Sequence, residues 1–276
     1  QQGLHVVDSI ETLLDPTGKT QNLMLTYAVR DGIISHCGEV RSTVIRPREE
    51  AMDLNDIERP SQYAPYTWEG CVVKIADKIA YLGRDIEDAV RLGILKEDGK
   101  PLQDLLKELN SYSREPIQSV TNTSIMYPLI TDICRESSPE AGLVLSQSHI
   151  NMMDAVMRFN YAHIYKNKRL EVYHAYARLI LESVYKLLRE CYDGTETMNN
   201  IRILAKDYPT LGRHFEKRMK KFSDSGRLEA DPDEYGNKVI YKISDSEDDY
   251  KKACIDYIAG MTDTYAEKIF GEITTF

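Results

Sequence analysis

The sequence is poor in the residues that mark several classes of protein. Gly and Pro account for only 15 and 10 of the 276 residues, which excludes collagen-like and low-complexity chains. No uninterrupted apolar run reaches the roughly 18 residues that a transmembrane helix needs, so we expect no contact with a membrane. What remains is typical of a globular protein that is long enough to bury a core of its own.

Cysteine pairs and an excess of positive charge are also missing. The five cysteines are scattered and form no CxxC pair, which suits a reducing compartment, so we expect a cytoplasmic protein. The net charge of −9 argues against a protein that coats nucleic acid through its overall charge. The basic stretch 213–221 is a candidate contact for single-stranded DNA, although a solvated helix face is the favoured interpretation.

Helical periodicity is the dominant pattern in what is present. The turn signal at 15–18 predicts a hairpin of two helices on either side of it. The segment 39–66 contains three prolines and is the longest predicted irregular region, as expected of an active-site or interface loop. One short strand is predicted at 238–243. The predicted helices span 3–14, 22–37, 67–92, 101–112, 115–135, 147–166, 168–191, 194–223 and 246–271.

The most informative segment is 67–93, which is rich in strong helix formers. Within it, Asp77, Tyr81 and Asp85 stand four residues apart, and successive steps of four share one helix face. Lys78 lies about 100° further round the helix, near enough for its long side chain to reach the same cleft. Carboxylates and a phenol on one face can hold a cation, wall a pocket and accept hydrogen bonds. By spacing alone, however, a solvated face with ordinary ion pairs remains the favoured interpretation.

Four segments, taken together, favour a functional interpretation. Together they resemble bacterial dGTP triphosphohydrolases and related HD-domain dNTP triphosphohydrolases, in the order in which that family carries them. Four ordered segments along nearly the whole chain are far more specific than a single short motif. The segments are LMLTYAVRDGIISHCGE (23–39), PYTWEG (65–70), ADKIAYLGRDIEDAVRLGIL (76–95) and DYIAGMTDTYA (256–266).

The resemblance implies a fold class and a division of the chain. The fold would be all-α, an HD-domain-like helical bundle with a helical C-terminal region and at most a minor β-hairpin. Residues 1–112 would complete the HD-type core, and residues 113–276 would form the C-terminal region. The family assembles into dimers to hexamers, so we expect a homo-oligomer.

The resemblance also implies an activity and a set of site residues. Members of the family use a divalent metal, Mg²⁺, Mn²⁺ or a similar transition metal, to hydrolyse a deoxynucleoside triphosphate to deoxynucleoside and inorganic triphosphate. Their pattern D-K-x-x-Y-x-x-x-D matches this chain at all four positions. Transferred to this chain, the family pattern implies that Asp77 is a metal ligand and that Lys78 contacts the triphosphate. Tyr81 would pack on the deoxyribose, and Asp85 would accept the 3′-hydroxyl.

The chain departs from the family pattern where the other metal ligands are expected. None of its six histidines is followed by Asp, so at most one of the family's four ligands is present, and one carboxylate holds a transition metal poorly. In the family a catalytic His precedes the segment that starts at Gln2. We therefore expect the natural protein to continue N-terminally, with the missing ligands and the general-acid His upstream of Gln1. Alone, the chain is expected to be inactive.

Two other functions stay open at this stage. One is a looser HD-type phosphohydrolase that acts on deoxynucleoside monophosphates and releases orthophosphate. The other is a catalytically inactive regulatory subunit that binds nucleotide and assembles with a complete partner. The identity of the inorganic product separates the first from the leading hypothesis, and binding without turnover would establish the second.

Two further patterns have packing as a competing interpretation. The C-terminal motif has Thr264 where its relatives usually have Arg, and a terminal helix that packs Tyr257 inward explains it as well as a role in the site. A group of tyrosines at roughly helical spacing is interpreted as core side chains with satisfied hydroxyls. Its members are Tyr161, Tyr165, Tyr173, Tyr176 and Tyr185.

Overall fold

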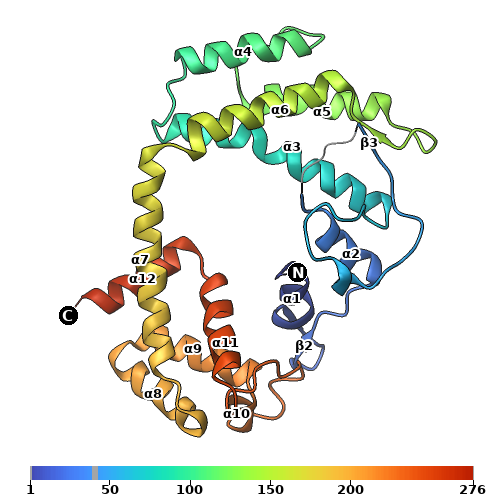
Figure 1. Ribbon diagram of the computed structural model, residues 1–276. Helices are drawn as coiled ribbons and strands as arrows, with labels where there is room; N and C mark the ends of the chain where they lie inside the picture. The colour runs from blue at the N-terminus through green and yellow to red at the C-terminus, as the bar shows by residue number, and fades with distance from the viewer. Residues whose placement is uncertain (1, 39–42, 276) are drawn as a thin grey trace. The chain divides into compact units, whose positions relative to one another are not determined.

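The computed structural model describes residues 2–38 and 43–275, and the chain forms two compact units. Unit 1 comprises Gln1–Leu4 and Leu25–Glu171, and unit 2 comprises His5–Met24 and Val172–Phe276. As the sequence predicts, the protein is mostly α-helical, and the described residues add only two small antiparallel ribbons (Figure 1). The predicted boundary at residue 112, between an HD-type core and a C-terminal region, is a different division from these two units and stays a prediction.

Helix α3 (Trp68–Arg91) is the central element of unit 1, as predicted for 67–92. The side chain of Thr67 caps its start by accepting a hydrogen bond from the backbone N–H of Gly70 at 3.1 Å, which satisfies one of the donors that a helix N-terminus leaves open. Its apolar face is buried at every turn, with Leu82 and Ile86 fully enclosed. The same helix carries the predicted site residues, so core packing fixes the position of their backbone.

The helices of unit 1 are arranged around α3 in two steps, some in direct contact with it and α4 (Lys100–Tyr112) beyond them (Figure 1). Helix α3 packs against α2 (Tyr27–Ser35), α5 (Asn122–Glu136) and α6 (Gln147–Asn160), and α4 packs on α6. The ribbon of β3 (Val44–Ile45) and β4 (Leu143–Val144) ties the loop after α2 to the turn after α5. Residues 39–42 of the predicted irregular segment 39–66 lie outside the described residues.

Unit 2 gathers the second half of the chain around a core of its own. It holds most of α7 (Lys168–Glu190), together with α8 (Thr197–Asp207), α9 (Pro209–Phe222), α11 (Glu247–Ala259) and α12 (Asp263–Thr274). Phe215 and Tyr250 are fully buried at its centre with ring centroids 6.0 Å apart. None of the helices in the described part of the chain is long and apolar enough to cross a bilayer.

Several helices are shorter than their periodicity predicts, because local chemistry ends or starts them. The predicted helix 115–135 begins only at Asn122, where Thr121 and Ser124 form a capping box. The predicted helix 194–223 divides at Pro209, which has no N–H to continue the ladder. The predicted helix 246–271 divides before Asp263, where the side chain of Thr262 accepts from the backbone of the new helix.

The predicted helical hairpin at the N-terminus is wrong. The chain is helical only through α1 (Gln2–His5) and the π-helical turn η1 (Val6–Ile10). It then forms a β-hairpin in which β1 (Thr12–Leu14) pairs with β2 (Thr20–Asn22). The turn at 15–18 therefore joins two strands.

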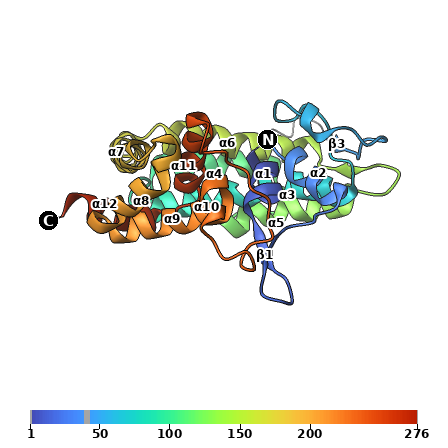
Figure 2. The same cartoon turned by 90° about the horizontal axis from the view of Figure 1, so that it is seen from below.

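One set of contacts within the turn and one with a distant loop stabilise this hairpin. The carboxylate of Asp15 accepts from the side chain of Thr17 and from the backbone N–H groups of Thr17 and Lys19, at 2.9 and 3.0 Å for the two amides. These hydrogen bonds lower the pKa of Asp15 to about 2. The backbone of Thr20 also pairs with the loop around Tyr235, beside which the hairpin lies in Figure 2. The predicted strand 238–243 is wrong, because that stretch forms only an isolated bridge.

The C-terminal motif serves the core of unit 2. The buried carboxylate of Asp256 accepts from the hydroxyl of Tyr241 at 2.7 Å, and it lies 2.8 Å from Nε2 of His5. Tyr257 packs its ring against Phe215, with centroids 5.1 Å apart. These contacts give the motif a packing role and leave Thr264 without a part in them.

A buried histidine makes the stability of unit 1 depend on pH. Nδ1 of His149 lies 3.0 Å from Oδ1 of Asp132 and 2.9 Å from the hydroxyl of Ser146. Burial lowers the pKa of His149 from 6.5, although Asp132 opposes the change, and Arg114 and Arg135 add to it. In the window between the lowered pKa and 6.5, the unfolded chain binds more protons than the folded chain, so stability is lost as the pH falls.

We expect the free energy of unfolding to fall below pH 6.5, with a slope of at most about 1.4 kcal/mol per pH unit from this single group. Urea unfolding between pH 5 and 8, followed for the wild type and for His149→Gln, measures it. The variant is expected to show a flatter profile. An unchanged profile in the variant would contradict the assignment to His149.

Candidate functional site

The four predicted site residues occupy successive turns of α3 but differ in burial. Asp77 is exposed, Tyr81 and Asp85 are half-buried, and Lys78 is buried with 8% of its surface exposed. Nζ of Lys78 lies 3.5 Å from the hydroxyl of Tyr81 and 5.6 Å from the centroid of its ring. A cation at this distance is attracted to the ring face, so Lys78 and Tyr81 form one group.

Lys78 lines a cavity of about 1100 Å³ in unit 1. Lys74, one turn earlier on α3, and Arg46 and Arg59, from the loop after α2, line it too. The other residues found to line it, within the described ranges 2–38 and 43–275, are uncharged. We call it the cation-lined cavity. Cations gathered around a cavity with low-dielectric walls create a positive potential that attracts polyanions.

Neutral partners hold two of these cations in place. Nζ of Lys74 donates to the carbonyls of Ser35, His36 and Cys37 at 3.3, 3.2 and 2.8 Å. These carbonyls end α2, where a helix leaves its acceptors open and where a cation is favourable. The guanidinium of Arg46 donates to the carbonyl of Glu140. Contacts of this kind orient the charged groups.

Sequence reasoning missed Tyr165 as a member of the site. Its hydroxyl donates to Oδ2 of Asp85. Burial, together with this carboxylate, raises the pKa of Tyr165, so the phenol keeps the proton that it donates. Tyr165 is 45% exposed, and Tyr161, Tyr173 and Tyr176 are 58%, 49% and 43% exposed, so the interpretation of these four as core side chains is wrong. Tyr185 alone of the group packs against the core of unit 2.

The position of Tyr165 depends on a change of helix type. Helix α6 continues as the π-helical turn η3 (Tyr161–Tyr165), a feature that is frequent at functional sites. At the junction the buried amide of Asn160 donates to the backbone carbonyl of Leu82 at 3.0 Å, which fixes this turn against α3. A separation of 80 residues between Tyr165 and Asp85 left no local signal from which their contact follows.

The described residues do not complete a metal site. No group of three His, Cys, Asp or Glu side chains in residues 2–38 and 43–275 is placed to hold a metal ion. Asp77 supplies one exposed carboxylate, whereas divalent metals take four to eight ligands. The role of Asp77 as a metal ligand therefore stays a prediction that depends on donors from elsewhere.

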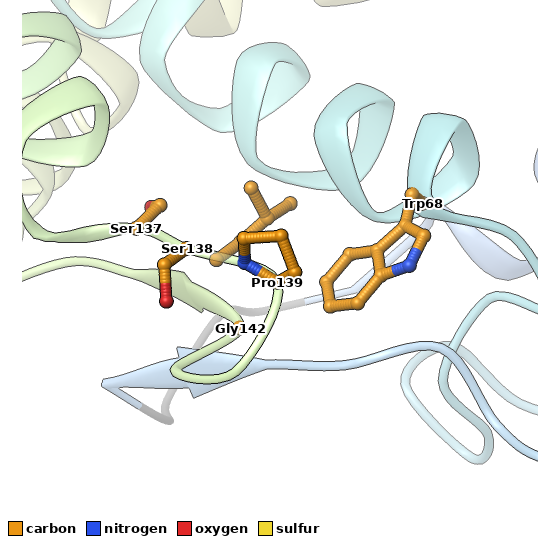
Figure 3. A pocket seen from close by; sticks show the side chains of 6 residues that line it. Trp68, Ser137, Ser138, Pro139 and Gly142 are labelled. Carbon is orange, nitrogen blue, oxygen red and sulfur yellow. The ribbon is translucent and has the colours of Figure 1, made fainter.

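A second pocket of about 330 Å³ lies at the start of α3. Figure 3 shows the indole of Trp68 beside the ring of Pro139. The hydroxyls of Ser137 and Ser138 accept from backbone amides of their own turn, at 2.9 and 3.0 Å. The residues found to line this pocket carry no charge, so it offers nothing to a phosphate, and the cation-lined cavity remains the candidate site.

Comparison with known proteins agrees with the motifs. No protein-family model matches the chain. A deoxyguanosinetriphosphate triphosphohydrolase-like protein of Clostridium perfringens strain 13 is 27% identical over 251 residues, which are 91% of this chain and 54% of that protein. A protein of the same name from Caldanaerobacter subterraneus is 24% identical over 273 residues, 99% of this chain and 57% of that protein. One from Azoarcus sp. strain BH72 is 26% identical over 270 residues, 97% and 64% of the two chains.

The chain thus spans little more than half the length of these curated relatives. The similarity extends along nearly all of this chain and includes the four segments that carry the sequence resemblance. The resemblance is confirmed: the chain is a relative of the deoxyguanosinetriphosphate triphosphohydrolase-like proteins.

Proposed function

We propose that this chain carries the sugar and triphosphate sites of a metal-dependent dNTP triphosphohydrolase with a dGTP-like substrate. The observation that carries the proposal is the placement of Lys78 in the cation-lined cavity, on the same helix as Tyr81 and Asp85. The names of the relatives support the substrate class.

The cation-lined cavity suits the triphosphate. Lys and Arg side chains are the usual partners of phosphate oxygens, and their hydrogen bonds to anions are about twice as strong as neutral ones. Lys74 and Lys78 come from α3, and Arg46 and Arg59 come from the loop after α2, so several phosphoryl groups can be contacted at once. A monophosphate is shorter and has fewer oxygens with which to contact these cations.

The next turns of α3 suit the deoxyribose. With a rise of 1.5 Å per residue, Asp85 lies about 10 Å along the helix from Lys78, and Tyr81 lies between them. A phenol ring in this position can pack against the sugar and exclude a 2′-hydroxyl. Tyr165 donates to one oxygen of Asp85, and the other oxygen can accept from the 3′-hydroxyl.

Hydrolysis needs more than these residues. A divalent ion bound partly by Asp77 would supply the charge that activates water and stabilises the α-phosphoryl group. Since the described residues hold no complete metal site, this chain binds and orients the substrate in our proposal. The remaining ligands would come from the length of the relatives that the chain does not span.

The decisive experiment is the identity of the inorganic product. A natural protein that contains the whole of this chain is incubated with Mn²⁺ and either dGTP or dGMP, and the products are separated by anion exchange. Release of inorganic triphosphate with deoxyguanosine is the expected result. Orthophosphate release from dGMP would establish the monophosphate hydrolase instead, and nucleotide binding without turnover would establish the regulatory subunit.

The contact between Tyr165 and Asp85 gives a test specific to the sugar. Tyr165→Phe removes a hydrogen bond to a charged group that is partly exposed, so we expect about fivefold weaker binding of dGTP. Calorimetric titration of the chain measures the change. The affinity for 2′,3′-dideoxy-GTP, which has no 3′-hydroxyl, should not change, and Tyr161→Phe serves as the matched control. An equal loss for both nucleotides would contradict the role of Asp85.

A further inference from the structure

A buried ion pair lies behind the loop that lines the cation-lined cavity. The carboxylate of Asp31 on α2 is fully buried, and the side chain of Arg48 is 13% exposed. Arg48 donates from Nη2 to Oδ1 of Asp31, and the backbone N–H of Tyr66 donates to Oδ2 at 2.6 Å. Both oxygens of this carboxylate thus bind the loop, one near its start and one at its end.

The guanidinium of Arg48 closes the loop on itself. Its Nε donates to the carbonyl of Glu50 at 3.0 Å, and its Nη1 donates to the carbonyl of Ala64 at 2.7 Å. The backbone N–H of Arg48 donates to the carbonyl of Pro65 at 3.0 Å. Five donors in a rigid fork are a property of Arg that Lys does not share. One side chain therefore joins the two ends of the segment 48–65.

Tyr27 adds a third fixed point. Its hydroxyl accepts from Nη2 of Arg48 at 2.7 Å and from the backbone N–H of Met52 at 2.8 Å, and it donates to the carbonyl of Met52 at 2.9 Å. Burial alone would lower the pKa of Arg48, but its hydrogen bonds with Asp31 and Tyr27 outweigh this and raise it. The group stays charged, and we call these three residues the Asp31–Arg48 clasp.

The clasp lies behind the cavity and not in it. Its side chains are absent from the residues found to line the cavity, whereas the loop that it closes contributes the stretch 59–65. Arg46 lies two residues before Arg48, and Arg59 lies within the closed loop. The positions of Arg46 and Arg59, two of the four cations, therefore depend on the clasp through the backbone.

We propose that the Asp31–Arg48 clasp positions Arg46 and Arg59 for a polyphosphate chain, and so sets the preference of the cavity for tripolyphosphate over orthophosphate. This inference rests on the proposed function, in which the cavity takes the triphosphate of the substrate. The clasp residues are positioning residues, because they act through the loop and do not face the ligand.

The test separates position from charge. Arg48→Lys keeps the positive charge and loses the fork, so a change in binding reports on the placement of the loop. Calorimetric titration of the chain in Tris buffer, without metal, uses sodium tripolyphosphate and sodium orthophosphate as probes. We expect Arg48→Lys to weaken the binding of tripolyphosphate by about tenfold or more and the binding of orthophosphate by much less. Arg91→Lys, an exposed residue of the same unit, is the matched control and should bind as the wild type does.

A double-mutant cycle supplies a readout that a merely structural role would not move. If the clasp acts by placing Arg59, then Arg59→Ala should weaken the binding of tripolyphosphate when it is made in the wild type. The same change should have little further effect on this affinity when it is made in the Arg48→Lys variant. Tyr27→Phe, which removes only the hydroxyl, gives a milder second variant should Arg48→Lys lose its fold, as judged by circular dichroism. Tyr27→Phe should weaken the binding of tripolyphosphate by a smaller factor than Arg48→Lys does.

The outcomes distinguish the inference from the function on which it rests. One outcome would overturn the positioning role alone: the wild-type chain binds tripolyphosphate, and folded clasp variants bind it with an affinity within twofold of the wild type. Additive effects of Arg48→Lys and Arg59→Ala would overturn it too. A wild-type chain that binds neither probe would overturn the assignment of the cavity to the triphosphate, and the positioning role with it.

Discussion

Asp77→Ala is expected to abolish triphosphate release by the complete protein while leaving tripolyphosphate binding by this chain alone unchanged. Asp77 is exposed on α3, so its replacement leaves the core intact. If it is a metal ligand, its loss should lower the rate by more than about a hundredfold, since losing a residue that only hydrogen-bonds to a ligand costs about 10- to 100-fold. In our proposal the cation-lined cavity binds phosphates without metal, and Asp77 is not among the residues found to line it.

Rates of triphosphate release with saturating Mn²⁺, and calorimetric metal affinity, measure the effect in the complete protein. Asp154→Ala is the control, because Asp154 is also an exposed helical aspartate of unit 1. A variant that retains its metal and its activity would exclude Asp77 as a ligand. Loss of tripolyphosphate binding by the Asp77→Ala chain alone would show that the residue serves the fold or the cavity instead.

The backbone of the site follows from the sequence, because local chemistry determines it. Thr67 caps α3, and strong helix formers with a repeating apolar face continue it to Arg91. The same local rules place Asp77, Lys78 and Asp85 on that helix. Whether these residues bind substrate is a separate matter, and the four-residue spacing by itself is equally typical of a solvated face.

The surroundings of that helix could not be predicted, because contacts between distant residues determine them. The cavity depends on Arg46 and Arg59, whose loop is held by the buried pair of Asp31 and Arg48, and no periodicity encodes this pair. The N-terminal hairpin is a similar case. Its apolar residues fit a helix pattern, but backbone pairing of Thr20 with the loop around Tyr235 favours strands.

Gly83→Ala should destabilise unit 1 although it replaces glycine inside a helix. In an open helix the change stabilises by about 1 kcal/mol. Here the added Cβ would lie 2.5 Å from Cα and 2.9 Å from Oδ1 of Asn122, at the start of α5. The obstacle includes backbone, so the two helices must move apart, and overpacking of this kind costs about 1–3 kcal/mol. The hydrogen bond from the backbone of Asn122 to Glu87, 2.8 Å long, would lengthen with them.

Gly32→Ala on α2 is the matched control, because the nearest atom to its new Cβ is 3.8 Å away. It should stabilise unit 1 by up to about 1 kcal/mol, so the two variants are expected to differ in sign. Urea unfolding followed by fluorescence of Trp68, the only tryptophan and a residue of unit 1, measures both. If Gly83→Ala were as stable as Gly32→Ala, the close approach of α3 and α5 would be excluded. Since Gly83 lies between Tyr81 and Asp85, that approach also constrains the turns of α3 that carry these two proposed sugar contacts.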